Sequence, residues 1–330
     1  MHLKFPAFFV LFLLPVFVLG QSQVSAKKAV MLMGCSFEVA ASAKNDTIAW
    51  KAIAAGITEI ERIEKLISSW DPESQTSEVN RMAGIKPVPV DKELYDLIYR
   101  ARKVSSLTGG AFDISFASMD PIWIFDQSEQ ALPTDGQIAE AKARINYQEI
   151  ILNPNDTSIY LSKGMKIGFG AIGKGYAANK AKQIMQKIPG VTGGVINASG
   201  DLLTWGESAS PEGWKIHIAN PHNKEKPIAW IQARDLAVVT SGDYEKYFTS
   251  QGKRYAHIID PRTGYPANGI TSVTIICPDA ELADALATSV FVLGREEGIA
   301  MINKLRQVEC IVMTDDGNMY QSNELTLNYY

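Results

Sequence analysis

Short apolar runs that each end in a turn follow one another through the middle of the chain, and they constrain its fold more than any other feature. The runs cover residues 193–201, 214–221, 228–233 and 236–244, and each has the length and composition of a strand. Helical patterns lie before and after them, without the regular strand and helix alternation that a parallel sheet requires. The sequence therefore predicts a mixed α/β fold of the α+β class, not a doubly wound sheet.

Amphipathic periodicity predicts the principal helices. Asn45 or Asp46 can cap a helix with one apolar stripe, formed by Ile53, Ile57, Ile60, Ile63 and Ile67. Similar patterns predict helices at 91–107, 279–293 and 295–305. With 330 residues, the chain is long enough for one large domain or for two closely packed lobes.

Two further local signals lie outside these helices. Residues 29–40 alternate enough to form a first strand, with Met33 and Gly34 as a break or bulge inside it. Thr134 and Gln137 have the spacing of a capping box, which predicts a short helix after them.

The first twenty residues have the pattern of an export signal. A basic start precedes an apolar run at 5–19, and small residues suited to cleavage follow at Gly20 and Ala26. Two prolines interrupt the run, and it is shorter than the roughly 20 residues of a spanning helix, so an uncleaved anchor is the weaker alternative. We expect a signal peptide at 1–20, or to residue 26, followed by one domain at 27–330.

Charge and cysteine content narrow the function classes. The net charge is −4, from 32 basic and 36 acidic residues, and no block of Lys or Arg stands out. The chain therefore does not have the electrostatic footprint of a nucleic-acid-binding protein. Its three cysteines, Cys35, Cys277 and Cys310, are far apart in sequence. The last two lie in β-branched runs and are expected to be buried small hydrophobes, so we assign the cysteines no disulfide or metal site.

The stretch R-Y-A-H-I-I-D-P-R-T-G-Y-P at 254–266 holds the strongest chemical signal. His257 ends a short run of β type and precedes turn-forming residues, so its imidazole is expected on a strand edge beside a rigid loop. Asp284 and Thr288 lie four residues apart in the predicted helix at 279–293 and project from one face. Their two oxygens can bind one hard cation. The pattern predicts a general base beside a metal platform.

A second informative stretch, M-K-I-G-F-G-A-I-G-K-G-Y at 165–176, is rich in glycine. We expect a strand that leads through the glycines into a helix, where exposed backbone N–H groups and Lys174 suit a phosphate. The stretch matches neither the phosphate loop of nucleotide triphosphatases nor a dinucleotide fingerprint. An equal alternative is that the small residues allow a helix and a strand to pack closely.

Eight short motifs follow one another in a fixed order along the chain. They are M-G-C at 33–35, S-S-W-D-P-E-S at 68–74, G-G-A-F-D at 109–113, the glycines of 168–175, N-A-S-G-D at 197–201, T-S-G-D-Y at 240–244, H-I-I-D-P-R-T-G-Y-P at 257–266 and A-D-A-L-A-T at 283–288. This order resembles that of the ApbE family, the FAD:protein FMN transferases. The resemblance covers nearly the whole chain after the N-terminal segment.

The resemblance implies a fold and a reaction. The fold would be two intimately packed lobes with the flavin site between them. The reaction would be Mg²⁺-dependent: FAD is cleaved, AMP is released, and FMN is joined by a phosphoester bond to a Thr or Ser hydroxyl of a target redox protein. Such targets are exported or membrane-bound, which implies a location in the periplasm or on the outer side of the inner membrane.

The resemblance also implies roles for single residues. His257 would be the general base, and Mg²⁺ would be held by the backbone carbonyl of Ala171 with Asp284 and Thr288. Contacts to FAD are implied, by position, for Met33, Trp70, Ala111, Phe112, Asp113, Gly168, Lys174 and Ile258.

This chain departs from the family pattern at three positions. Gly168 stands where Asp is common, Ala287 stands where some members have a further Asp, and Trp70 stands where Tyr is frequent. The first two leave fewer polar groups for the cofactor and the cation. Two alternatives remain beside the transferase. One is an FAD pyrophosphatase that releases FMN and AMP, which needs the same cation and uses water in place of the acceptor hydroxyl. The other is an exported flavin-binding protein without turnover, which Gly168 and Ala287 favour.

Overall fold

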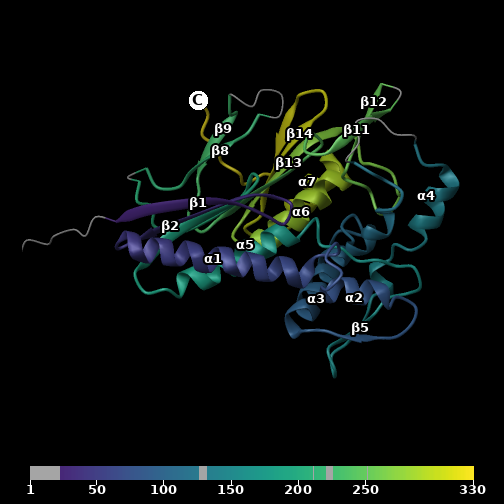
Figure 1. Ribbon diagram of the computed structural model, residues 1–330. Coiled ribbons are helices and arrows are strands. Elements are labelled where there is room, and N and C mark those ends of the chain that lie inside the picture. The colour runs from purple at the N-terminus through teal and green to yellow at the C-terminus, as the bar shows by residue number, and fades with distance from the viewer. Residues whose placement is uncertain (1–22, 126–131, 211, 221–225, 251) are drawn as a thin grey trace, which may run out of the picture.

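The computed structural model describes most of the chain (Figure 1). The described residues are 23–125, 132–210, 212–220, 226–250 and 252–330. The signal peptide predicted at 1–20 lies outside them. Within the described residues, no helix is both long enough and apolar enough to span a bilayer.

An eight-stranded sheet forms the centre of the described fold. Its strands, in spatial order, are β1 (Val24–Leu32), β2 (Cys35–Ala43), β6 (Val191–Ala198), β7 (Asp201–Gly206), β10 (Ala237–Gly242), β13 (Ile270–Cys277), β14 (Glu309–Thr314) and β15 (Met319–Gln321). All neighbouring strands are antiparallel. The predicted mixed α/β class is confirmed, and the antiparallel order explains why no regular strand and helix alternation is visible in the sequence.

The single strand predicted at 29–40 is wrong, because the chain reverses within it. Leu32 pairs directly with Cys35, so β1 and β2 form a hairpin with a two-residue turn. Met33 and Gly34 have φ values of 50° and 73°, the left-handed conformation that such a tight hairpin turn requires at both positions. The predicted bulge is therefore a turn, and it lies at the end of the sheet.

Helices cover one face of this sheet, and a small hairpin covers part of the other. The helices of the described residues, not all of which lie on the sheet, are α1 (Asp46–Ile67), α2 (Gln75–Arg81), α3 (Lys92–Leu107), α4 (Asp135–Lys142), α5 (Gly173–Gln186), α6 (Ala280–Leu293) and α7 (Arg295–Ile302), with short 3₁₀ helices η1 (Ile114–Met119) and η2 (Tyr147–Glu149). Figure 1 shows α1, α5 and α6 along the same face. The opposite face carries β8 (Lys215–Ile218) and β9 (Ala229–Gln232).

Alternating residues of the central strands pack into two different apolar clusters, one on each face of the sheet. In β10, Val239 packs into the main core under the helices, whereas Val238 packs against the β8–β9 hairpin. Ile275 and Ile276 of β13 divide in the same way. Both faces of the central strands are therefore buried, which explains their continuous apolar runs.

Two of the predicted helix starts are confirmed by their caps. The Asn45 side chain accepts the Ile48 N–H at 3.0 Å at the start of α1. Thr134 and Gln137 form the predicted capping box of α4. Such caps satisfy backbone donors that the first helical turn leaves without a partner.

The remaining elements surround the end of the sheet at which the β1–β2 turn lies. A three-stranded sheet consists of β3 (Val88–Pro89), β5 (Ser158–Tyr160) and β4 (Ile151–Asn153), and a separate hairpin consists of β11 (Tyr247–Ser250) and β12 (Lys253–Ala256). Phe248 of this hairpin stacks on Trp123, with ring centroids 6.1 Å apart. Leu94 and Leu97 of α3 belong to the same core cluster as the sheet and its helices. The α3 side of the site therefore shares the main core, whereas Phe248 of the β11–β12 hairpin packs with Trp123 in a separate apolar cluster.

Candidate active site

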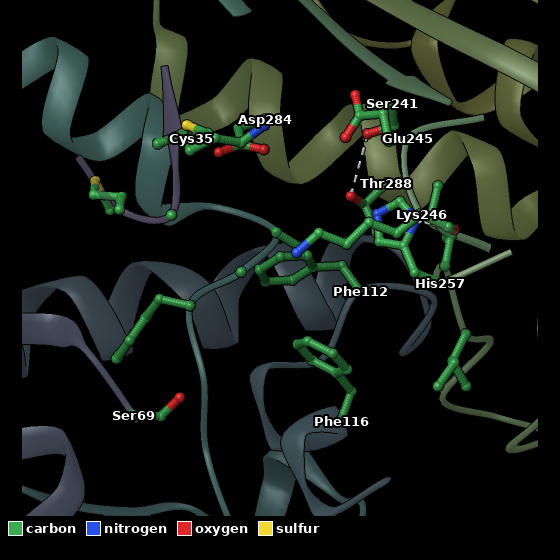
Figure 2. A pocket seen from close by; sticks show the side chains of 18 of the residues that line it. Cys35, Ser69, Phe112, Phe116, Ser241, Glu245, Lys246, His257, Asp284 and Thr288 are labelled. Carbon is green, nitrogen blue, oxygen red and sulfur yellow. Dashed lines mark hydrogen bonds between the residues drawn. The ribbon is translucent and has the colours of Figure 1, made fainter. Parts of the chain in front are cut away.

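A single cavity of about 660 Å³ gathers nearly all of the predicted site residues (Figure 2). Its walls come from the β1–β2 turn, the end of α1, the segment before η1, the start of α5, the end of β10, the loop after β12, and α6. The predicted residues in its lining are Met33, Trp70, Ala111, Phe112, Asp113, Ala171, Lys174, His257, Ile258, Asp284 and Thr288. Site residues that the sequence predicted at distant positions along the chain therefore lie close together in the fold.

Gly168 is the predicted site residue that does not line this cavity. Its N–H donates to the Ile114 carbonyl at 2.9 Å, and a Cβ there would lie 3.0 Å from the Ala117 Cβ. The strand expected before the glycines is also absent from this stretch. The Asn80 side chain bonds both backbone groups of Ile167, at 2.8 and 2.9 Å, and so takes the place of a neighbouring strand.

The glycines at the start of α5 permit a close helix contact. A Cβ on Gly175 would lie 2.0 Å from the Ala280 carbonyl oxygen, so this position requires glycine where α5 meets α6. The Gly175 N–H donates to Asp284 Oδ2 at 3.0 Å. The packing explanation therefore holds at Gly175, and at the same place a first-turn N–H already binds a carboxylate oxygen.

Two carboxylates and one ammonium form a buried cluster beside the cavity. Lys174 Nζ lies 2.5 Å from Asp201 Oδ2, and the other Asp201 oxygen accepts the Thr240 N–H at 3.1 Å. Asp284 is 3% exposed. Burial and, to a smaller extent, the Asp201 charge raise the pKa of Asp284 to about 7, against the opposing effect of Lys174.

Lys174 stays charged in this cluster. Burial alone would lower the pKa of its ammonium, but Asp201 and Asp284 raise the pKa above its ordinary value. One cation therefore faces two carboxyl groups, and the cluster can accept a second positive charge. Asp201 was not among the predicted site residues, although it ends the N-A-S-G-D motif.

Oxygen donors continue along α6 from Asp284. Thr288 follows one turn later, and its hydroxyl lies 3.4 Å from the Ser241 hydroxyl. In the part of the chain that the structure describes, no group of three or more His, Cys, Asp or Glu side chains is placed to hold a metal. A cation here would depend on the Asp284 carboxylate, the Thr288 hydroxyl and the Ala171 carbonyl, all of which are oxygen donors that suit Mg²⁺.

His257 follows β12 directly and is held by the backbone of Lys246. Its N–H donates to the Lys246 carbonyl at 3.0 Å, and its ring Nδ1 lies 3.1 Å from the same oxygen. A carbonyl oxygen only accepts, so Nδ1 carries the proton and Nε2 keeps a lone pair. Burial, together with the charges of Lys246 and Lys174, lowers the pKa of His257 to about 4, so the imidazole is neutral at pH 7.

The opposite wall is apolar and is anchored by Asp113. One Asp113 oxygen accepts the Ser115 N–H at 2.8 Å and the Ser115 hydroxyl at 2.6 Å, and the other accepts the Tyr147 N–H at 2.8 Å. These bonds hold the segment that carries Phe112. Trp70 is 83% exposed at the cavity, so its ring is accessible to a ligand.

Sequence reasoning missed several residues of the lining. They are Gly34, Cys35, Glu64, Ile67, Ser68, Ser69, Phe116, Phe169, Gly170, Thr240, Ser241, Glu245, Lys246, Ile259 and Pro261. Glu64 accepts the Met33 N–H at 2.8 Å and holds the β1–β2 turn against α1. The signal for Glu245 and Lys246 was their position directly after the T-S-G-D-Y motif.

The fold and this cavity define a mixed α/β enzyme in which one cavity combines a neutral imidazole, a buried acidic cluster and aromatic walls. The ApbE family profile matches residues 33–312. The chain therefore belongs to the ApbE family, and it is a transferase.

Individual relatives agree with this assignment. The FAD:protein FMN transferase of Treponema pallidum is 32% identical over 281 residues, covering 80% of this chain and 77% of the relative. That of Klebsiella pneumoniae is 31% identical over 283 residues, covering 84% and 87%. The crystal structure of the ApbE protein of Thermotoga maritima is similar with a TM-score of 0.85 and 30% identity, covering 91% of this chain and 97% of that one.

Proposed function

We propose that this chain is a Mg²⁺-dependent FAD:protein FMN transferase that attaches FMN to a Thr or Ser hydroxyl of a target redox protein. One observation carries the proposal: His257, Asp284 and Thr288 line the same cavity. Its volume of about 660 Å³ lies within the range of about 300–1,000 Å³ typical of small-molecule sites. The names of the relatives supply the substrate, and the cavity supplies groups suited to it.

FAD would lie across this cavity with its two ends against different walls. The flavin would lie against the apolar wall near Phe112 and Trp70, because flat rings bind well on aromatic and apolar surfaces. The diphosphate would lie near Lys174 and the first turn of α5, where the helix dipole and a cation held beside Asp284 would favour anions.

Mg²⁺ fits the oxygen donors beside this position. Asp284, Thr288 and the Ala171 carbonyl would hold it, and the surplus carboxylate charge of the buried cluster favours a divalent cation there. When bound, it would neutralise charge on the diphosphate oxygens. Asp284 would then be ionised, since a nearby cation opposes the effect of burial on its pKa.

The transfer needs a base for the incoming alcohol. His257 Nε2 takes the proton of the Thr or Ser hydroxyl as its oxygen bonds to the FMN phosphorus. The bond from that phosphorus to the bridging oxygen breaks, and AMP leaves with the electron pair. The Lys246 carbonyl keeps the Nδ1 proton in place, so that Nε2 remains the accepting atom.

We also propose that the protein is exported and acts in the periplasm or on the outer side of the inner membrane. The supporting observation is the basic start, apolar run and small residues of the first twenty positions. The region 27–330 would then be the single catalytic domain, acting on exported or membrane-bound redox proteins.

Incubation with FAD, Mg²⁺ and an acceptor domain tests the function. An added FMN mass on the acceptor, lost with EDTA and with a Thr→Val or Ser→Ala acceptor, is the expected result. Release of FMN and AMP without attachment would instead identify a pyrophosphatase. Intact FAD bound without turnover would identify a flavin-binding protein.

A further inference from the structure

Two lysines line the cavity, and their surroundings differ. Lys174 is ion-paired with Asp201 at 2.5 Å and is also close to Asp284, so its charge is already balanced within the protein. Lys246 is exposed to the cavity, and its ammonium makes no ion pair or hydrogen bond with any residue that the structure describes. Figure 2 shows its side chain extending from beside His257 toward Phe112. Lys246 is therefore the lining cation that is available to a ligand.

The position of Lys246 is tied to that of the imidazole. Its carbonyl accepts the backbone N–H of His257 at 3.0 Å and contacts ring Nδ1 at 3.1 Å. These two contacts fix the Lys246 main chain relative to the imidazole, while the side chain remains free to follow a substrate. The Lys246 main chain thus lies beside the imidazole, and its side chain carries the ammonium away from it toward Phe112.

Cleavage of a diphosphate is assisted by positive groups near the oxygens of both phosphates. The phosphate that leaves gains negative charge on the bridging oxygen as its bond to the other phosphorus breaks. The cluster of Asp201, Asp284 and Lys174, with the proposed Mg²⁺ site, would bind the oxygens of one phosphate. Between His257 and Phe112, Lys246 is the available positive group.

We propose that Lys246 is a catalytic residue that binds the leaving phosphate of the dinucleotide. This rests on the proposed function. Its ammonium donates hydrogen bonds to the oxygens of the AMP phosphate and stabilises the charge that develops on the bridging oxygen as the electron pair moves there. The proton of the acceptor hydroxyl goes to His257 Nε2, and Lys246 keeps its own protons throughout.

Substitution of Lys246 tests this role. Lys246→Met keeps the length of the side chain and removes the charge, and we expect kcat of FMN transfer to fall about 10- to 100-fold, the value of a charge-assisted hydrogen bond. Lys246→Arg should retain activity within a few fold. Lys51→Met, at an exposed position of α1, is the matched control and should behave as the unaltered protein.

Two binding measurements distinguish a phosphate contact from a structural effect. Lys246→Met should weaken FAD binding and leave riboflavin binding unchanged, because riboflavin has no phosphate. The variant should also raise the apparent pKa of the acid limb of kcat/KM, since one positive charge near His257 is removed.

The inference is overturned if Lys246→Met keeps both kcat and FAD affinity within twofold of the unaltered protein. Equal losses of FAD and riboflavin binding would also overturn it, because they indicate a structural role. If the unaltered protein binds FAD and transfers no FMN, the proposed function fails. The comparison of FAD with riboflavin binding would still decide whether Lys246 contacts phosphate.

Discussion

Two walls of the cavity differ in how their charges are held. The helix wall consists of the first turn of α5 with α6, and carries Lys174 and Asp284. The hairpin wall consists of the residues on either side of the β11–β12 hairpin, and carries Lys246 and His257. In the helix wall, Lys174 pairs with Asp201 of β7, and Asp284 accepts a backbone N–H. In the hairpin wall, one backbone carbonyl holds the imidazole and the ammonium extends freely.

The difference indicates a division of tasks between the walls. Buried ions that are paired keep a fixed geometry, which suits a site for a cation and a diphosphate. An exposed lysine and an imidazole with a free Nε2 can follow a reacting group. We therefore expect changes in the hairpin wall to affect chemistry, and changes in the helix wall to affect both chemistry and stability.

The first prediction concerns the hairpin wall and has the largest expected effect. His257→Gln should retain FAD binding and lower FMN transfer about 10²- to 10⁴-fold, the range of a lost general base. Its unfolding free energy should change little, which an unfolding curve in urea measures. His217→Gln is the control, since His217 lies on β8 and stacks on Tyr330 at 5.8 Å. Undiminished transfer by His257→Gln would remove the base assignment.

The second prediction concerns the helix wall. Asp284→Asn keeps the shape of the side chain and should lower transfer about 10²- to 10³-fold. Its dependence on Mg²⁺ concentration should weaken, as a titration of activity with MgCl₂ measures. A variant with the normal Mg²⁺ response would contradict the proposed metal position.

Asp284→Asn should lower activity but should not lower stability at neutral pH. Burial raises the pKa of Asp284. The contribution of its protonated form to the free energy of unfolding is therefore complete below about pH 4 and is lost as the pH rises toward about 7. In metal-free buffer, the variant should be at least as stable as the unaltered protein at pH 7, with a smaller difference at pH 4. Asp315→Asn, at an exposed position, should show no such pH dependence.

The groups of the two walls differ in how well the sequence predicted them. Asp284 and Thr288 were predicted because four-residue spacing on a helix places side chains on one face. His257 was predicted because turn-forming residues follow a short strand. The Lys174 and Asp201 pair was not predicted, since the two residues meet only after the β6–β7 turn brings Asp201 to α5. Local patterns carry no information on such a contact.

Parts of the fold escaped prediction for a similar reason. A two-residue turn preserves the alternation of a hairpin, so residues 29–40 look like one strand. The positive φ values of Met33 and Gly34 separate β1 from β2, and methionine is uncommon in that conformation. The stretch before Gly168 has the composition of a strand, yet the Asn80 side chain bonds to its backbone in place of a neighbouring strand. Tertiary contacts decided both cases.

The third prediction concerns the pH dependence of the hairpin wall. Burial lowers the pKa of His257 to about 4, so the neutral base persists as the pH falls until about that value. Transfer at low FAD should keep most of its rate at pH 5, about 30-fold more than a base of pKa about 6.5 would allow. The measurement is kcat/KM between pH 4 and 8 at two Mg²⁺ concentrations. A limb set by Asp284 would move with Mg²⁺, whereas a Mg²⁺-independent limb near 6.5 would contradict the environment described for His257.

The fourth prediction tests how tightly the helix wall is built. Gly175→Ala would place a Cβ 2.0 Å from the Ala280 carbonyl oxygen and 2.9 Å from the Asp284 Cβ, so α5 and α6 must move apart. We expect the unfolding free energy to fall by about 1–3 kcal/mol, as for other overpacked sites, measured by urea unfolding. Gly136→Ala is the control, because a Cβ at that position of α4 meets no atom within 4 Å. Equal stability of the two variants would mean that α5 and α6 accommodate the added methyl group without cost. The fixed geometry proposed for the helix wall would then lose its structural basis.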